Sequence, residues 1–146
     1  MKLEVRQVTE VTDSLLEAFG RLMPQLSPRL EAPSGERLRA VAANPSAALF
    51  TAESGGAVVG ALTLVWYDVP SGRKAWIEDV VVDAEARGTG AGRALVAAAL
   101  EHAAVIGAGK VLLTSNPARE AARALYRKMG FEEAATTVFA IKTDAK

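Results

Sequence analysis

The chain has 146 residues, half of them hydrophobic and none of them cysteine. This length suits one core, so we expect a single domain spanning residues 1–146, and the lack of cysteine excludes disulfides and cysteine-bound metals. The 17 basic and 17 acidic side chains give a net charge of zero, which argues against nucleic acid and anionic membranes as partners. No apolar run resembles a signal peptide or a membrane span, so a cytoplasmic protein is expected.

The first half of the chain alternates between strand-like and helix-like patterns. Thr12 or Asp13 can cap a first helix and Ser34 a second, and the prolines between them exclude one continuous helix. A diglycine turn then joins two strands of an antiparallel meander. In order, we expect a strand at 2–8, a helix carrying Leu15, Leu16, Phe19 and Leu22, a helix at 35–43, and strands at 47–53, 57–67 and 74–82.

The second half of the chain contains two segments with helical spacing of apolar residues, separated by a strand. Gly107 and Gly130 end its two helices, and Phe131 is placed to fold back on the last turn of the second. We expect a helix at 90–106, a buried strand at 110–115, a helix from Asn116-Pro117 to Met129, and a closing edge strand at 136–142 that a partner could cover. This order predicts an α+β fold, a mixed sheet with helices packed on it.

The most informative segment is a glycine-rich turn between a buried strand and a long helix. The strand ends in Val80, Val81 and Val82, and the glycine turn, residues 87–92, follows it. Its glycines let the backbone approach a ligand closely, and a helix N-terminus offers unpaired N–H groups and a positive dipole end. Arg87 and Arg93 add donors that match phosphate oxygens. The segment therefore predicts a phosphate site.

Two common phosphate motifs do not fit this turn. A P-loop needs Gly-Lys followed by Ser or Thr, but Arg93 and Ala94 follow Gly92. A dinucleotide fingerprint needs a third glycine where Arg93 stands, and an acidic residue about 20 positions on, where none is found near Lys110.

Three separated motifs together resemble the GNAT acetyltransferase family. They are the arginine and glycines of the turn, a strand that ends in asparagine, and a helix that ends in Tyr-x-x-x-Gly-Phe; here they stand at 87–92, 112–116 and 124–131. The resemblance covers nearly the whole chain. It implies a mostly antiparallel sheet of about six to seven strands with four helices, in which the fourth and fifth strands run parallel and splay apart.

The resemblance also implies that acetyl-CoA lies between the splayed strands and that no metal is needed. The strand residues would contact the acetyl group and the pantetheine arm, the glycine turn would hold the pyrophosphate, and Asn116 would reach the pantetheine arm, although Asn116 can equally cap the next helix. The cofactor-binding residues so implied are Val80, Val81, Val82, Arg87, Gly88, Thr89, Gly90, Ala91, Gly92, Arg93 and Asn116.

Acetyl transfer to an amine needs a base for the amine and a proton for the departing thiolate. Tyr126 matches the family's tyrosine that protonates the CoA sulfur. Glu78 is the candidate base, and by strand alternation it shares a face with Val80 and Val82. Asp79 would replace it if a bulge shifts the register, and solvent is the third option.

Several features bear on the acceptor without identifying it. The segment 23–33, including Glu31, and Asp68 lie where the family binds its acceptor, and a carboxylate there would favour a cation. The aromatic residues of two adjacent strands form either core or a wall of the acceptor pocket, and His102 is expected to be an ordinary helix residue. Those aromatic residues are Trp66, Tyr67 and Trp76.

Three functions follow from these features. The first is an enzyme that transfers the acetyl group of acetyl-CoA to a primary amine. The second is an inactive module that binds acetyl-CoA or CoA, and the third is a nucleotide-binding protein that uses the glycine turn. Dimers are common in the family, so a homodimer is compatible with the sequence.

Overall fold

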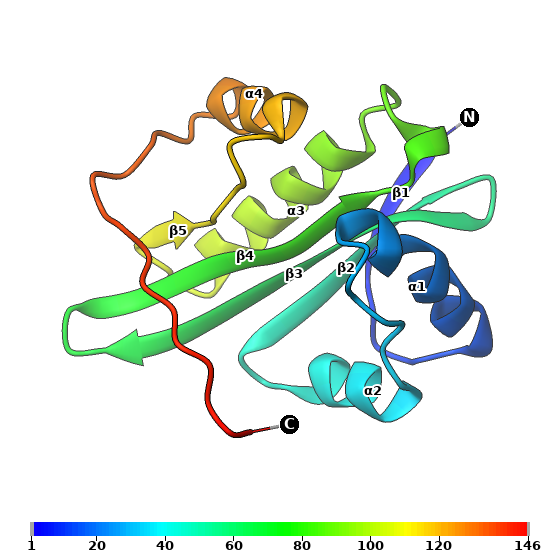
Figure 1. The fold of residues 1–146 in the computed structure, drawn as a ribbon, viewed down its shortest axis with the longest axis horizontal. Coiled ribbons are helices and arrows are strands. Elements are labelled where there is room, and N and C mark those ends of the chain that lie inside the picture. The colour runs from blue at the N-terminus through cyan, green and yellow to red at the C-terminus, as the bar shows by residue number, and fades with distance from the viewer. Residues whose placement is uncertain (1, 146) are drawn as a thin grey trace. The chain divides into compact units, whose positions relative to one another are not determined.

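The computed structural model describes residues 2–145, which fold as two compact units, residues 2–113 and 114–145. The first unit contains a sheet with helices, and the second contains one helix among its described residues (Figure 1). The elements of the first unit are β1 (Leu3–Gln7), α1 (Asp13–Leu26), α2 (Gly35–Ala43), β2 (Ala47–Ser54), β3 (Ala57–Val69), β4 (Gly72–Val82), the 3₁₀ turn η1 (Ala84–Ala86), α3 (Ala91–Val105) and β5 (Lys110–Leu112). The second unit contains α4 (Glu120–Lys128).

The sheet has the order β1-β2-β3-β4-β5, with antiparallel pairing from β1 to β4 and parallel pairing of β4 with β5. Gly55 and Gly56 join β2 to β3 with φ angles of 58° and 81°, the left-handed values that a tight hairpin turn requires. The antiparallel meander and the parallel fifth strand are confirmed.

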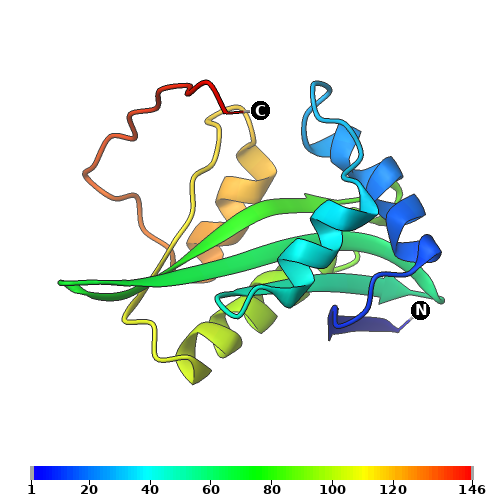
Figure 2. The same cartoon turned by 90° about the horizontal axis from the view of Figure 1, so that it is seen from below.

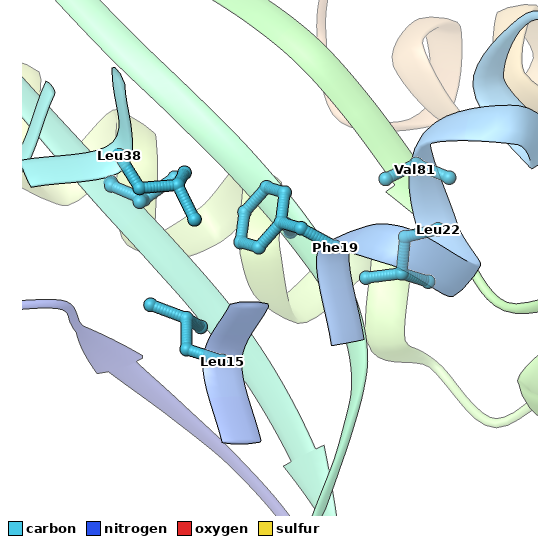
Figure 3. Close-up of a cluster of buried hydrophobic side chains, with 7 residues drawn as sticks. Leu15, Phe19, Leu22, Leu38 and Val81 are labelled. Atoms are coloured by element: carbon cyan, nitrogen blue, oxygen red, sulfur yellow. The ribbon is translucent and has the colours of Figure 1, made fainter. Parts of the chain in front are cut away.

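Helices cover both faces of this sheet. α1 and α2 lie on one face and α3 on the other (Figure 2). On the first face, Leu15, Phe19 and Leu22 of α1 meet Leu38 of α2 and Val81 of β4 in a buried cluster (Figure 3). Each such side chain contributes about 1.5–3 kcal/mol of folding free energy when it is buried. This cluster therefore holds α1 against the strand that leads to the glycine turn.

The α3 face is closely packed against β3. A side chain at Gly60 would come within 3.1 Å of the Leu95 Cδ1 atom and 3.0 Å of the Val81 carbonyl oxygen. Leu95 and Val96 are fully buried. The glycine in β3 therefore lets α3 approach the sheet closely. This packing holds α3, and with it the helix N-terminus that follows β4, against the sheet.

The predicted caps form. The Thr12 hydroxyl accepts the Leu15 N–H at 3.1 Å, and the Ser34 hydroxyl accepts the Arg37 N–H at 3.0 Å. At the end of α3, Gly107 adopts a φ of 74°, with the paired carbonyl bonds of a Schellman cap. Local sequence signals thus set these helix ends.

Helix α1 runs two residues past Pro24, whereas the proline signal favours an earlier end. A proline ring normally clashes with the carbonyl group four residues before it, which here belongs to Gly20. The helix ends at Leu26, so the lost hydrogen bond falls in its last turn and little of the ladder is disrupted. The loop from Ser27 to Ser34 is irregular, as the prolines predict.

The closing strand predicted at 136–142 is wrong, and so is the count of six to seven strands. Five strands form in the described residues, and residues 134–142 form neither helix nor strand. Val138, Phe139 and Ile141 are 68%, 91% and 92% exposed. Strand propensity measures packing on a neighbouring strand, and this segment has no such neighbour among the described residues.

Candidate functional site

Strand β4 contains a bulge next to the candidate base. Glu78 pairs with Thr63 and Val81 with Ala61, so two β4 residues, Asp79 and Val80, stand opposite one residue of β3. Asp79 has a φ of 49°, the only positive value of a residue other than glycine in the described chain. A bulged residue of this kind re-aims the side chains that follow it.

The bulge changes which residues share the face of Glu78. Directly paired residues lie on one face, and Thr63 and Ala61 alternate onto the same face of β3. Glu78 therefore shares its face with Trp76 and Val81, the face that α1 covers. The expectation that Val80 and Val82 lie on that face is wrong, because simple alternation does not count the extra residue.

The second half of β4 has a free edge. Its pairing with β5 ends at Trp76 opposite Leu112, while β4 continues to Val82. From Ile77 to Val82, the backbone groups that face away from β3 have no partner strand in the described residues. The parallel pairing of the fourth and fifth strands is thus confirmed, while their splay stays a prediction. The free edge leaves backbone donors and acceptors next to the predicted cofactor residues.

The start of the turn after β4 is held by several hydrogen bonds. The Asp83 N–H donates to the Val59 carbonyl at 2.8 Å, and the Asp83 carboxylate accepts the Glu85 N–H at 3.1 Å. The Thr89 hydroxyl donates to the Ala86 carbonyl at 2.5 Å, so its hydrogen is already in use. The backbone of the turn, more than the Thr89 side chain, remains to meet a ligand.

The glycine turn itself has the geometry of an anion site. Gly88 and Gly90 have φ angles of 79° and 89°, and a Cβ atom at either would meet nothing within 4 Å. The first helical hydrogen bond of α3 runs from the Ala94 N–H to the Gly90 carbonyl, which leaves the preceding N–H groups of the helix, at 91–93, without helical partners. Open space and free donors therefore coincide at a helix N-terminus.

Arg87 and Arg93 stand at the two ends of this turn. Both side chains are exposed, and neither forms an ion pair within residues 2–145. A guanidinium group can bind phosphate oxygens with two parallel hydrogen bonds. The residues present thus fit a pyrophosphate.

Glu78 and Asp79 form a pair of adjacent carboxylates beside the free edge of β4. Partial desolvation, followed by the charge of Asp79, raises the pKa of Glu78 above its ordinary value of 4.5. Neither carboxylate forms an ion pair in the described part of the chain. Glu78 therefore binds a proton more readily than a free glutamate, which suits a general base.

The three aromatic residues of β3 and β4 divide between the two faces. The Trp76 indole N–H donates to the Tyr67 hydroxyl at 2.9 Å on the face of Glu78. Trp66 lies on the opposite face, where its ring is 5.4 Å from that of His102. Only the first pair can line a site that includes Glu78, and Trp66 and His102 belong to the packing of α3.

Of the predicted acceptor-side carboxylates, Asp68 is already paired. Its two oxygens accept from Arg73 at 2.7 and 2.9 Å, and this hydrogen bonding lowers the pKa of Asp68. The remaining guanidinium nitrogen of Arg73, Nη1, donates to the Ile106 carbonyl at 2.8 Å, so the pair braces the β3–β4 hairpin. Glu31 is exposed in the loop between α1 and α2.

Two predicted site residues, Asn116 and Tyr126, lie in the second unit, while Glu78 and the glycine turn lie in the first. The Asn116 Oδ1 atom accepts the Ala118 N–H at 2.9 Å and so closes a turn before α4. α4 itself begins at Glu120, later than the expected start at Pro117. The expectation that Asn116 caps the helix is therefore wrong, because its side chain closes a local turn and Arg119 stands at the N-cap of α4. The amide N–H₂ group of Asn116 takes no part in that bond.

Tyr126 lies in the last turn of α4. The Phe131 N–H donates to the Tyr126 carbonyl at 3.0 Å, and the two rings are 5.9 Å apart, which confirms the predicted Schellman cap with its hydrophobic contact. Burial raises the pKa of the Tyr126 hydroxyl above 10.0, partly offset by the charge of Arg119. The phenol therefore keeps its proton throughout the neutral range.

One residue next to the turn was missed by the sequence reasoning. The Gln25 Oε1 atom accepts the Ala84 N–H at 2.8 Å across 59 residues of chain. No spacing or motif marks an exposed glutamine near the end of a helix, so only the tertiary structure could find it.

Within residues 2–145, no group of three or more acidic or histidine side chains is arranged to hold a metal ion. The helices described are all too short or too polar to cross a membrane.

Comparisons with known proteins match one family model and many solved structures. A sequence model described as the acetyltransferase (GNAT) family matches residues 9–131, and a search of curated proteins found no match. The chain is similar to the crystal structure of a transcriptional regulator from Bacillus halodurans C-125, at 25% identity and a TM-score of 0.81 over 97% of this chain and 100% of that one.

Two further solved structures are acetyltransferases. The aminoglycoside acetyltransferase HMB0005 from an uncultured soil metagenomic sample is 26% identical, with a TM-score of 0.80 over 99% of this chain and 100% of that one. AAC(6')-Iy, solved in complex with the bisubstrate analog CoA-S-monomethyl-acetylneamine, is 21% identical, with a TM-score of 0.79 over 98% and 99%. The likeness to AAC(6')-Iy shows a shared fold alone.

Proposed function

The chain belongs to the acetyltransferase (GNAT) family, and we propose that it transfers the acetyl group of acetyl-CoA to a primary amine of a small molecule or peptide. The observation that carries this proposal is the course of β4. The strand leaves β5 after Trp76, continues with a free edge, and runs into the glycine turn at the start of α3. The free edge of β4 offers backbone partners for the amides of the pantetheine arm of acetyl-CoA. The glycine turn then offers N–H donors for its pyrophosphate.

Acetyl-CoA supplies the thioester whose carbon the acceptor nitrogen attacks. We propose that the glycine turn and the N-terminus of α3 bind its pyrophosphate, and that Val80–Val82 bind the pantetheine arm through their backbone. Asn116 retains a free amide donor for the same arm. Holding donor and acceptor together in this way replaces a bimolecular encounter with an oriented one.

Glu78 is the proposed base. An alkyl ammonium has a pKa near 10, so the acceptor must lose a proton before its nitrogen can attack. The raised pKa of Glu78 brings the carboxylate closer to neutral pH, where proton transfer by a general base is most effective. The Glu78 carboxylate takes this proton before the nitrogen attacks. The second proton, which the nitrogen loses once the carbon–nitrogen bond has formed, balances the one that the departing sulfur gains.

Tyr126 is the proposed acid. As the carbon–sulfur bond breaks, the sulfur becomes negative and accepts a hydrogen bond from the phenol, along which a proton can pass. A thiol has a pKa near 8.5, below that of a phenol, so complete transfer is uphill. The main gain is the hydrogen bond that the retained phenol proton donates to the developing charge.

Calorimetric titration with acetyl-CoA, with ATP and NAD as controls, tests the cofactor. We expect micromolar binding of acetyl-CoA alone; preferential binding of ATP or NAD would favour the nucleotide-binding alternative. A thiol reagent then measures CoA release with a panel of amines, and because the chain has no cysteine, any free thiol comes from CoA. Binding of acetyl-CoA with no release from any amine would favour the inactive binding module.

A further inference from the structure

The side chain of Gln25 is held at both ends by backbone groups. Its Nε2 atom donates to the Arg21 carbonyl at 3.1 Å, within the same helix, and its Oε1 atom accepts the Ala84 N–H at 2.8 Å. The first bond orients the amide, and the second, called here the Gln25 tether, crosses from α1 to the segment after β4. Figure 1 shows the end of α1 beside the end of β4.

The tether acts on the first N–H of η1. A short helix leaves its first N–H groups without helical partners, and here they are satisfied from outside the helix. Gln25 takes the N–H of Ala84 and the Asp83 carboxylate takes that of Glu85. Since Ala86 is buried and the glycine turn begins at Arg87, these bonds set the direction in which the chain enters the turn.

At its other end, the tether is attached to the last turn of α1. Pro24 weakens that turn because it lacks an N–H for the helical ladder. The irregular loop at 27–34 begins two residues after Gln25. A displacement of this loop therefore reaches Gln25 before it reaches the buried core residue Leu22, three residues further into the helix.

We propose that Gln25 is a positioning residue that couples the loop at 27–34 to the glycine turn, so that binding of acetyl-CoA at the turn orders the loop. This inference rests on the proposed function. Two ligands that favour one arrangement of such an element help each other to bind, so an acceptor that contacts the loop binds more tightly once acetyl-CoA is present.

The test compares Gln25→Met with Gln25→Glu. Methionine has a similar length but forms neither hydrogen bond, whereas glutamate keeps an oxygen for the Ala84 N–H. Asn44→Ala is the matched control, because the Asn44 Oδ1 atom accepts the Ser46 N–H at 2.8 Å in the same kind of bond. The measurements are amide hydrogen exchange of segments 84–90 and 27–34, with and without acetyl-CoA, and calorimetric binding of acetyl-CoA.

In the ligand-free protein we expect exchange of segment 84–90 to be about fivefold faster in Gln25→Met, as the loss of one hydrogen bond predicts, and near wild type in Gln25→Glu and Asn44→Ala. Acetyl-CoA should slow exchange of segment 27–34 in the wild type but not in Gln25→Met, which should bind acetyl-CoA about fivefold more weakly. Asn44→Ala should bind it normally.

Unchanged exchange of 84–90 in ligand-free Gln25→Met would refute the tether. Equal protection of the loop by acetyl-CoA in the wild type and Gln25→Met, or no protection in the wild type, would refute the coupling. If the wild type does not bind acetyl-CoA, the proposed function and the coupling both fail, and the ligand-free exchange still decides whether Gln25 positions the turn.

Discussion

At the scale of single residues, Glu78 is suited to act as a base because it forms no ion pair within the described residues. It stands beside Asp79 at the bulge, and both desolvation and the neighbouring charge raise its pKa. The proton is therefore lost at a higher pH than from an ordinary glutamate, and a base is active only after it has lost that proton. Activity should fall as the pH decreases through this raised pKa, which lies above 4.5.

Glu78→Gln should remove this acidic limb from the pH profile of kcat/KM and lower the rate at neutral pH about 10²-fold or more. Steady-state rates between pH 5 and 9 provide the measurement. Glu101→Gln, on the exposed side of α3, is the control and should leave the profile unchanged. A Glu78→Gln profile that matches the wild type would assign the proton to Asp79 or to solvent.

Tyr126 is the second residue with a role to test. Its ring packs against Phe131, and phenylalanine would keep that contact and lose only the hydroxyl. We expect Tyr126→Phe to fold normally and to bind acetyl-CoA as the wild type does, with kcat reduced about 10²-fold. A wild-type kcat would exclude Tyr126 as the acid; calorimetry and thiol release separate binding from turnover.

At the scale of elements, the turn between β4 and α3 depends on backbone conformations that favour glycine. Gly90 has a φ of 89° in open space, so a side chain there would strain the backbone and occupy the anion site. Gly90→Val should cost about 1–3 kcal/mol of unfolding free energy and abolish acetyl-CoA binding, as measured by urea denaturation and calorimetry.

Gly20→Ala is the matched control for that variant. Gly20 lies in α1, and a Cβ atom there would also meet nothing within 4 Å. Its backbone is helical, so alanine should raise the unfolding free energy by about 0.5–1 kcal/mol and leave binding unchanged. Normal acetyl-CoA affinity in Gly90→Val would show that the pyrophosphate binds elsewhere.

The attachment of α1 to the sheet is the other element on which the site depends. Leu22 of α1 is fully buried, in the same cluster as Val81 of β4. Leu22→Ala should reduce the unfolding free energy by about 2–5 kcal/mol, since it removes buried methyl groups and leaves a cavity. Thermal and urea unfolding measure this, and a loss below 1 kcal/mol would mean that the cluster collapses around the gap.

At the scale of the whole molecule, the balance of charges confines electrostatic effects to the site. The net charge is zero, so no overall field draws anions to the protein. Arg87 and Arg93 are exposed and without ion pairs in the described residues. Any attraction for the phosphates of acetyl-CoA should therefore be local and screened by salt.

We expect acetyl-CoA binding to weaken as salt increases from 0.05 to 0.5 M, and to weaken less in Arg87→Gln. Exposed charge pairs contribute about 0.2–1 kcal/mol, so the change in the dissociation constant should be several-fold. Calorimetry at several salt concentrations is the measurement. An identical salt dependence in the wild type and the variant would exclude Arg87 from phosphate binding.

The sequence by itself determined the features that depend on neighbours along the chain. The hydroxyl caps at Thr12 and Ser34, the glycine caps at Gly107 and Gly130, and the diglycine hairpin need only a few adjacent residues, because their hydrogen bonds close over one turn of backbone. The glycine turn belongs to the same class. A single domain, the dimer and the roles of Glu78, Tyr126 and the turn stay predictions.

Only the tertiary structure decided the features that depend on partners far along the chain. The bulge at Asp79 follows from the register against β3, and it reverses the faces expected for Val80 and Val82. The segment 136–142 has strand-forming residues but no neighbouring strand in the described chain, and the Gln25 tether joins groups 59 residues apart. Sheet pairing and long-range hydrogen bonds satisfy backbone groups with partners that no local pattern identifies.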